Sequence, residues 1–326
     1  MNDAFDPIRL SIDPAAETER ICTVLRQQVL KHLRRRGVVL GLSGGVDSSV
    51  VAALCVRAFG PTAVFGVLMP EQDSDPDSLR LGRTVASWLG VDFAIEDITP
   101  ILLASGCYRR RDEFIRKVFP EYGPGWRSKI VLRKTGLTAG YNVFHLVVRG
   151  PQGEQKEARM PADVYLGVVA TTNMKQRTRK QLEYYHADRL NFAVAGTPNR
   201  LEYDQGFFVK NGDGAADVKP IAHLYKSQVY ALAEHLGVPE EIRRRPPTTD
   251  TYSLSQTQEE FFFGIPLHTL DACMYALDHD IPAETVAPVV GLSPEQVHDV
   301  YRDIAGRRRT TRYQHEAPLL VDGGGN

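Results

Sequence analysis

The residues whose types and spacing most clearly suit ligand binding or catalysis form one short run near the N-terminus, Ser43-Gly44-Gly45-Val46-Asp47-Ser48-Ser49. Its two glycines let backbone amides approach a ligand closely, and its serine hydroxyls add hydrogen-bond donors. Donors gathered in this way predict an anion site, most simply for phosphate. The run is not a Walker loop, because the GxxxxGK[ST] pattern is absent. A serine-glycine turn with an aspartate helix cap is the alternative that binds no ligand.

Asp47 is the unexpected member of this run, because a carboxylate inside an anion site repels phosphate. A cation between the two groups removes that repulsion. Nucleotide sites commonly hold Mg²⁺ through one or two carboxylates together with phosphate oxygens. We therefore expect Asp47 to reach a phosphate through Mg²⁺.

The run lies between two elements that must position it. Residues 38–42 (VVLGL) form a continuous apolar segment typical of a buried strand. Residues 50–60 (VVAALCVRAFG) predict a helix that ends at Gly60. The run is thus expected at a helix start, where the partial positive charge of the helix N-terminus favours an anion.

The same succession of elements continues and sets the fold class. A second buried strand is predicted at 63–69, a helix at 76–89 after the cap residue Asp75, and a third strand at 91–98. This order predicts an α/β fold with a doubly wound parallel sheet. Further elements are expected at 174–185 (helix), 191–196 (strand) and 224–237 (helix), followed by tail helices at 265–280, 282–291 and 293–309.

The α/β pattern is interrupted between residues 107 and 167, and we interpret this segment as an insertion. Its first part is basic and aromatic with proline and glycine breakers. Residues 141–148 and 157–160 flank a turn-rich connector, which predicts a β-hairpin. Loops longer than ~15 residues in compact domains are usually either functional or disordered. The insertion is expected to form either a lid over an anionic or ring-bearing ligand or a contact between two copies of the chain.

The chain is divided into an α/β domain over residues 1–275, which contains the insertion, and a C-terminal helical extension and tail over 276–326. Apolar residues of the tail helices fit either an internal core or a dimer contact. Gly291 in a turn and a capping box of Ser293 and Gln296 would also suit a helix-turn-helix. The second helix carries Glu295 and Asp299, which oppose DNA phosphates, so a DNA-binding regulator is the remote alternative.

Composition excludes several classes of protein. Lys and Arg total 39 and Asp and Glu total 40, so the net charge of -1 gives no basic excess for nucleic-acid binding. No apolar run approaches the ~20 residues that span a bilayer, and the N-terminus resembles no signal peptide. The 4 cysteines lie far apart without a CxxC pair. A cytoplasmic protein with no membrane or nucleic-acid partner is expected.

The run at 43–49, with its strand and helix, resembles the N-type ATP pyrophosphatases, which cleave ATP between the α- and β-phosphates to adenylate a substrate. Residues of the second half are similar to the ammonia-dependent NAD synthetase family. NMKQRTR at 173–179 resembles that family's NIKARTR, and 196–217 follows its GT…E…GFF…GDG…D pattern without a gap. LYK at 224–226 and PTTD at 247–250 match later segments. The resemblance covers residues 15–105 and 168–275 and implies an adenine nucleotide α-hydrolase-like fold.

The resemblance also implies roles for individual residues. Asp47 and Glu202 would hold Mg²⁺, and Asp47 and Lys226 are the implied catalytic residues. Arg177, Lys210 and Asp217 would contact the acid that is adenylated. The residues implied for ATP binding are Gly41, Leu42, Ser43, Gly44, Gly45, Val46, Asp47, Ser48, Thr197, Lys226 and Thr248.

Each implied role has a chemical reason and a plain alternative. Lys226 would stabilise charge on the departing pyrophosphate, but it is also an ordinary first-turn helix lysine. Glu202 is a hard oxygen ligand suited to Mg²⁺, or else a solvated surface acid. Arg177 lies among other basic residues and fits a solvated basic face as well. Asp213 is a weaker candidate that fits a turn-shaping role.

The expected function is that of an ATP-dependent amide ligase with Mg²⁺ as cofactor and ATP as co-substrate. ATP adenylates the carboxylate of deamido-NAD, and ammonia attacks the acyl-adenylate to give NAD, AMP and pyrophosphate. Ammonia is expected because no segment resembles a glutaminase domain, so it would arrive free or from a separate subunit. The resemblance implies a homodimer.

A related ligase that acts on a different carboxylic acid is the alternative. The chain departs from the family at residues 198–201 and 69–73, lacks a clear counterpart of its C-terminal HK pair, and carries the insertion. The departures at 198–201, the HK pair and the insertion fall where the family would meet the dinucleotide, whereas the ATP-side residues are retained.

Overall fold

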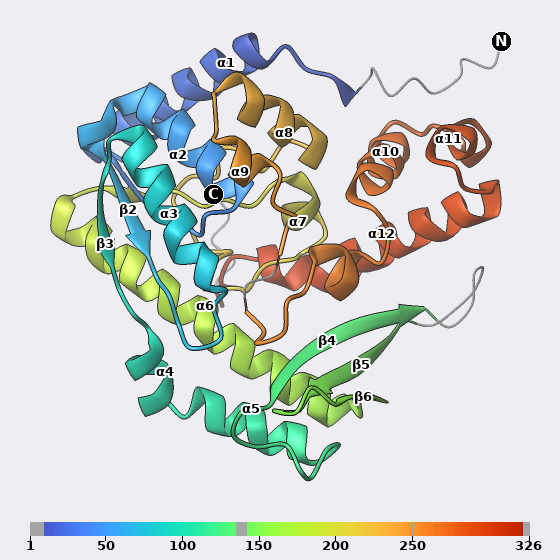
Figure 1. The fold of residues 1–326 in the computed structure, drawn as a ribbon. Coiled ribbons are helices and arrows are strands. Elements are labelled where there is room, and N and C mark those ends of the chain that lie inside the picture. The colour runs from blue at the N-terminus through green and yellow to red at the C-terminus, as the bar shows by residue number, and fades with distance from the viewer. Residues whose placement is uncertain (1–9, 135–141, 249–250, 322–326) are drawn as a thin grey trace.

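The computed structural model describes residues 10–134, 142–248 and 251–321 and contains two sheets (Figure 1). The central sheet is parallel, with strand order β3-β2-β1-β7. Its strands are β1 (Val38–Gly41), β2 (Val64–Leu68), β3 (Asp92–Ile95) and β7 (Ala193–Val194). The predicted parallel α/β sheet is confirmed, although β7 is shorter than the strand predicted at 191–196.

Helices cover both faces of this sheet, which is what makes it doubly wound. Val38 and Leu40 of β1 point into a core shared with helices α1 (Pro14–Arg26), α2 (Val46–Phe59), α3 (Pro76–Leu89) and α8 (Lys226–His235). Val39 points to the other face, into a core shared with α6 (Ala162–Leu190). Successive strand residues alternate between faces, so a strand buried on both sides must be apolar throughout.

Helix starts follow the local cap chemistry. Asp13 caps α1 by accepting from the amides of Ala15 (2.9 Å) and Ala16 (3.2 Å). Asp75 caps α3 as predicted, by accepting from the amide of Asp77 at 2.9 Å. Both helices place proline at their first position, where its missing N–H costs nothing. Shorter helical pieces are η2 (Gln27–His32), η3 (Pro61–Ala63), α7 (Arg200–Asp204) and α9 (Glu240–Arg243).

The insertion forms a layer of its own below the parallel sheet in Figure 1. Helices α4 (Thr99–Ala104) and α5 (Cys107–Arg116) lead into an antiparallel sheet of β4 (Arg127–Lys134), β5 (Asn142–Arg149) and β6 (Gln155–Arg159). The predicted hairpin is confirmed as β5–β6, with Arg149 opposite Gln155. Strand β4 was not predicted, because its partner follows only after residues 135–141, which lie outside the described part of the chain.

Helix α6 starts earlier and ends later than the predicted helix at 174–185. Its first turns pack against the inserted sheet through Val164 and Val168, and its last turns pack against the parallel sheet through Ala187. The N-terminal turns escaped prediction because they fall inside the segment interpreted as an insertion. One helix therefore joins both layers.

The C-terminal segment contributes η4 (Glu259–Phe263) and three helices, α10 (Leu267–Asp278), α11 (Ala283–Val290) and α12 (Pro294–His315). Met274 is fully buried among them, and Tyr275 and Leu277 pack on the same core. The predicted box at Ser293 is present, with the Gln296 amide donating to Ser293 Oγ at 3.3 Å. These apolar faces thus form an internal core.

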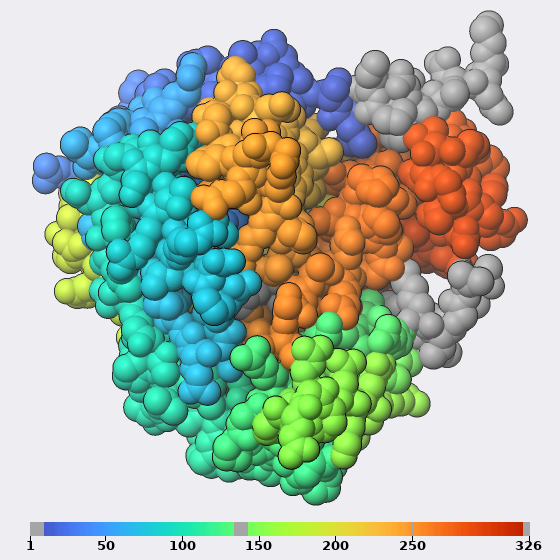
Figure 2. Space-filling model, in the orientation of Figure 1, coloured from blue at the N-terminus to red at the C-terminus, as the bar shows by residue number. Residues whose placement is uncertain are grey.

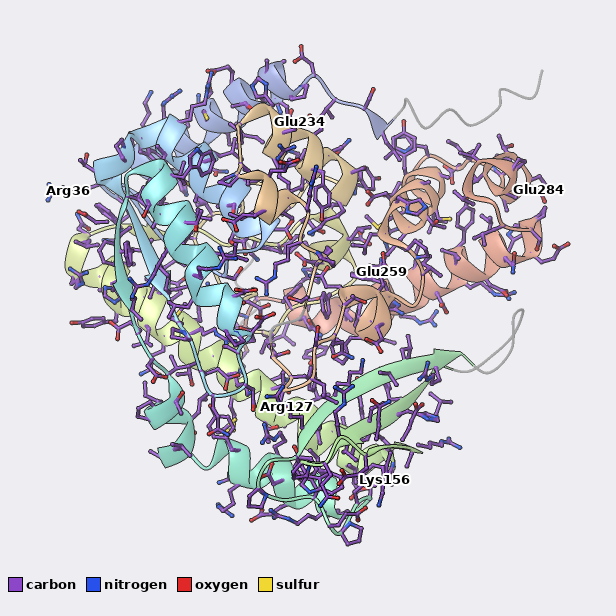
Figure 3. All side chains as sticks on the ribbon, viewed as in Figure 1. Arg36, Arg127, Lys156, Glu234, Glu259 and Glu284 are labelled. Atoms are coloured by element: carbon purple, nitrogen blue, oxygen red, sulfur yellow. The ribbon has the colours of Figure 1, made fainter. Side chains whose placement is uncertain are left out.

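The surface view places the inserted segment directly beside the C-terminal segment (Figure 2). Charged side chains such as Arg36, Lys156, Glu234 and Glu284 point outward (Figure 3). In the described part of the chain no helix is long and apolar enough to cross a membrane. All 4 cysteines are buried and unpaired.

Candidate active site

The 43–49 run lies at the carboxyl end of β1, between β2 on one side and β7 on the other. The chain leaves β1 toward β2 and later returns to β7, so the connections diverge here. Open α/β sheets bind ligands at such a switch point, because diverging connections leave a crevice. Thr197 follows β7 and lines the same crevice.

The run adopts the shape expected of an anion loop. Gly44 has φ +75, and a Cβ there would lie 2.5 Å from Leu81 Cβ, so glycine is required. Gly45 is the N-cap of α2. The hydroxyls of Ser43 and Ser48 lie 3.1 Å apart at the start of that helix. Amides, hydroxyls and a helix N-terminus therefore converge at one point.

Lys226 and Asp47 form a charge pair beside this loop. Lys226 is buried, and its Nζ donates to Asp47 Oδ2. Burial disfavours the charge of Lys226, but Asp47 and Glu202 outweigh that effect and raise its pKa, so it is a cation at neutral pH. Asp271 of α10 holds the start of α8 by accepting from the amides of Lys226 (3.2 Å) and Ser227 (2.8 Å).

Glu202 is held close to this pair by two further residues. Asn199 caps α7, and the two residues exchange hydrogen bonds of 3.1 Å between backbone and side chain. Gln258 Nε2 donates to Glu202 Oε1 at 2.7 Å. Removal from water, followed by the charge of Asp47, raises the pKa of Glu202 to about 7. The family departure at 198–201 is therefore a helix cap that orients the glutamate.

The charged residues of the site line one hollow of about 400 Å³, which shares lining residues with a second hollow of about 230 Å³ at the carboxyl ends of β1 and β2. Asp47, Glu202 and Lys226 face the larger hollow, and Gly41 and Leu42 face the smaller. Gly44 shapes the loop and is not among the lining residues. The other residues implied for ATP line one hollow or both: Ser43, Gly45, Val46, Ser48, Thr197 and Thr248.

The three residues implied for the acid lie outside the lining of both hollows. Arg177 Nε donates to the Lys210 carbonyl at 3.2 Å, and Lys210 Nζ donates to the carbonyls of Tyr313 (2.8 Å) and Glu316 (2.9 Å). Asp217 accepts from the Val194 amide at 2.7 Å. Arg177 and Lys210 are thus adjacent, while Asp217 is bound to β7. Their roles toward the acid stay predictions.

Asp213, the weaker candidate from the sequence, faces both hollows and also shapes its turn, because its carboxylate accepts a hydrogen bond from the Val209 amide at 2.8 Å. Other residues around the hollows were not predicted from the sequence. Gln258 lines the larger hollow and reaches Glu202 from 56 residues away, a contact that sequence spacing does not reveal. Asn199 lies only three residues before Glu202, so the capping box that they form was an available local signal. An aromatic wall completes the larger hollow, and the FFF run at 261–263 was the available signal. Its residues are Phe207, Phe208, Phe261, Phe262 and Tyr313.

The fold and the site together define the class of protein. A parallel sheet covered by helices on both faces, with a serine-glycine loop at its switch point, is consistent with the adenine nucleotide α-hydrolase-like fold. The family model described as NAD synthase matches residues 17–117 and 154–318. The chain belongs to the NAD synthase family.

Individual proteins agree with this assignment. The chain is 64% identical over 317 residues to the NH(3)-dependent NAD(+) synthetase of Rhizobium meliloti (strain 1021), covering 97% of this chain and 95% of that protein. Among solved structures, the NH3-dependent NAD synthetase from Campylobacter jejuni superposes with a TM-score of 0.62 at 24% identity, over 95% of this chain and 100% of that one. An NMN synthetase from Francisella tularensis gives 0.63 at 21% identity, over 96% and 100%. These two structures support the fold alone.

The pKa of Glu202 predicts how stability depends on pH in metal-free protein. Below pH 4.5, the ordinary pKa of a glutamate, Glu202 is protonated in both the folded and the unfolded protein. Between pH 4.5 and about 7, Glu202 ionises in the unfolded protein but stays protonated in the folded protein. The free energy of unfolding should therefore fall between these two pH values, by at most about 3 kcal/mol. Denaturation of wild type and Glu202→Gln in chelator, from pH 4.5 to 8, measures the effect as a change in their difference. Parallel profiles of the two proteins would exclude it.

Proposed function

We infer that the protein is an ATP-dependent amide ligase that adenylates the carboxylate of deamido-NAD and transfers ammonia to it, giving NAD, AMP and pyrophosphate. The observation that carries this is the convergence of the serine-glycine loop, Lys226 and the two carboxylates on one hollow. Membership of the NAD synthase family and the identity to an NH(3)-dependent relative support the same reaction.

The residues of the hollow supply the chemistry that adenylation needs. A carboxylate is a poor electrophile, so its oxygen must first be joined to the α-phosphate while pyrophosphate departs. The amides and hydroxyls around Ser43 and Ser48 would hold the pyrophosphate oxygens. The permanent charge of Lys226 would stabilise the negative charge that develops on the leaving group. Ammonia then displaces AMP from the acyl-adenylate.

The donor set around Asp47 and Glu202 fits Mg²⁺. Their carboxylates are close enough for the charge of Asp47 to raise the pKa of Glu202, and a divalent cation between them would relieve that repulsion. In the described residues no group of three or more His, Cys, Asp or Glu is arranged to hold a metal. Two carboxylates completed by phosphate and water suit Mg²⁺, which when bound neutralises phosphate charge.

The aromatic wall supports an acid with a flat ring. Phe207 stacks on Phe262 with ring centroids 4.6 Å apart, beside Phe261 at 6.0 Å. Such a wall offers stacking to a pyridine ring without ion pairing. A homodimer in the cytoplasm, using small-molecule substrates with no nucleic acid or membrane, completes the proposal.

The test is a substrate screen with three readouts. Protein, ATP, Mg²⁺ and ammonium are mixed with deamido-NAD, and the NAD, AMP and pyrophosphate formed are measured. The three products are expected in equal amounts. A kcat/KM for deamido-NAD of ~10⁴ M⁻¹s⁻¹ or more is expected of an enzyme on its own substrate. Nicotinic acid mononucleotide and simple carboxylic acids serve as comparisons. Fast pyrophosphate release on another acid, with deamido-NAD slower by several decades, would establish the alternative ligase instead.

A further inference from the structure

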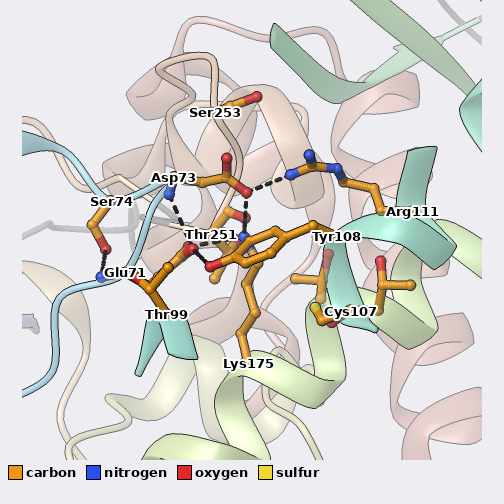
Figure 4. Close-up of polar contacts among 12 residues, drawn as sticks. Glu71, Asp73, Ser74, Thr99, Cys107, Tyr108, Arg111, Lys175, Thr251 and Ser253 are labelled. Atoms are coloured by element: carbon orange, nitrogen blue, oxygen red, sulfur yellow. Dashed lines mark hydrogen bonds and ion pairs between the residues drawn. The ribbon is translucent and has the colours of Figure 1, made fainter. Parts of the chain in front are cut away.

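A second polar cluster lies next to the two hollows and is not accounted for by the reaction. It consists of Glu71, Asp73, Tyr108, Arg111 and Lys175, and we call it the Lys175 cluster (Figure 4). The side chains of Glu71, Lys175 and Asp73 are 0%, 3% and 6% exposed. Buried charges are costly unless paired, so a cluster of this kind requires a reason.

The ammonium of Lys175 and both carboxylate oxygens of Glu71 have hydrogen-bond partners. Lys175 Nζ donates to Glu71 Oε1 (2.8 Å), Asp73 Oδ2 (2.7 Å) and the Thr251 carbonyl (3.0 Å), which uses all three of its protons. The Tyr108 hydroxyl donates to Glu71 Oε2 at 2.7 Å, and Arg111 donates to Asp73 Oδ2. Burial and this bond raise the pKa of Tyr108, so its hydroxyl remains a donor.

The cluster joins four segments that are distant in the sequence. Glu71 and Asp73 follow β2, Tyr108 and Arg111 lie on α5 of the insertion, Lys175 lies on α6, and Thr251 opens the segment 251–258. Three of these segments form walls of the site, and α6 lines both hollows through Gln176. Met69, Pro70 and Ser74 line the smaller hollow, and Thr251 and Tyr252 line the larger.

The segment 251–258 also carries contacts that reach the ATP side. Thr257 pairs with Thr248, and Gln258 holds Glu202. Its outer edge is bound to the inserted strand β4, where the Ser128 amide donates to Ser253 Oγ (2.8 Å) and the Leu254 amide donates to the Ser128 carbonyl (3.2 Å). The insertion thus fixes this segment directly through β4 and indirectly through the Lys175 cluster.

We propose that Lys175 is a positioning residue for ATP binding. Through its bonds to Glu71, Asp73 and the Thr251 carbonyl, Lys175 fixes the position of the wall at 69–74 relative to the segment 251–258. The insertion then acts as a brace for the ATP side of the site rather than as a lid over the acid. The proposed role of Lys175 rests on the proposed function only for the identity of the acid, because ATP binding is measured on its own in the experiment below.

A double variant that keeps the net charge of the cluster distinguishes a positioning role of Lys175 from a role in stability alone. Lys175→Met leaves Glu71 and Asp73 with Arg111 alone, which Asp112 also contacts at 2.9 Å, so a buried carboxylate lacks its counterion and stability should fall. Adding Glu71→Gln removes one negative charge for the positive charge lost with Lys175, so the net charge of the cluster returns to that of wild type while Asp73 and Arg111 remain paired. The double variant still lacks any ammonium to bind the Thr251 carbonyl. Stability and ATP binding should therefore separate in it.

The experiment measures the thermal midpoint, the Kd of a non-hydrolysable ATP analogue by calorimetry, and steady-state kinetics for three variants. We expect Lys175→Met to lower the midpoint by about 10 °C. We expect Lys175→Met/Glu71→Gln to regain most of that midpoint, while its Kd for the analogue and its KM for ATP stay at least tenfold above wild type. Its kcat at saturating ATP should stay within threefold. Lys117→Met, which removes the exposed 2.9 Å pair with Asp163 between the insertion and α6, is the control and should match wild type.

Recovery of both midpoint and Kd in the double variant would show that Lys175 only balances charge, which overturns the proposal. An unchanged Kd in Lys175→Met would do the same, as would failure of the balanced variant to fold. If wild type binds the analogue but makes no NAD, the proposed function fails while the role of Lys175 is still measured.

Discussion

Asp47→Asn is expected to lower the rate of pyrophosphate release by at least ~100-fold at saturating Mg²⁺, with the fold intact. Asparagine keeps the size of the side chain and can still accept the bond that Asn199 Nδ2 donates to Oδ1 at 3.4 Å. It removes the negative charge that faces Lys226 and that would bind the cation on the pyrophosphate. Losing one such electrostatic contact commonly costs ~3 kcal/mol of transition-state stabilisation.

The chain offers a matched control for this substitution. Asp77 is the second residue of α3, as Asp47 is the second residue of α2, so both carboxylates meet a helix N-terminus. Asp77 faces Arg80 on the surface at 3.2 Å. Asp77→Asn should leave kcat unchanged while repeating any effect on helix stability. If Asp47→Asn retains more than a tenth of the wild-type rate, Asp47 does not have the assigned role.

Lys226→Met is expected to lower kcat by ~100-fold or more, for a different reason. Methionine preserves much of the volume of a side chain that is 3% exposed, but it leaves Asp47 and Glu202 without their neighbouring cation. The leaving pyrophosphate would lose its permanent positive partner, so chemistry should slow more than ATP binding weakens. Single-turnover measurement of AMP formation reads the chemical step directly.

Stability provides the counter-check for this second variant. A lysine needed only as an ordinary first-turn helix residue would, when replaced, alter the free energy of unfolding and leave AMP formation within a fewfold of wild type. That result would show that Lys226 has a structural role and not a catalytic one. A slow chemical step in a protein with a near-normal unfolding midpoint supports the catalytic assignment.

Much of the site could be predicted because its signals are local. The 43–49 run, its strand and its helix are contiguous, and the caps at Asp75 and Ser293 depend on neighbours within three residues. The hairpin β5–β6 was predictable for the same reason, since a short turn fixes its register. Patterns over a few residues carry this information without knowledge of the fold.

The remainder depends on partners that meet only in the folded chain. Asn199 and Glu202 are an exception, because their capping box spans only three residues, but residues 198–201 were interpreted as a departure from the family pattern. Lys175 lies 104 residues from Glu71 and 76 from Thr251, so no spacing rule links them. The same holds for Gln258 and Glu202, 56 residues apart. Long-range polar pairs of this kind are invisible to periodicity.

Helix α6 has a mechanical consequence. It is 29 residues long, about 43 Å, and is embedded at one end in the inserted layer and at the other in the parallel sheet. It contains no proline and only one glycine, Gly167 in its first turns, so it lacks the features at which helices usually bend. The two layers are therefore held at opposite ends of one helix that has no hinge, and we expect them to move little relative to each other. Entry and release of substrates are then expected to depend on movements of the shorter segments at the rim of the site.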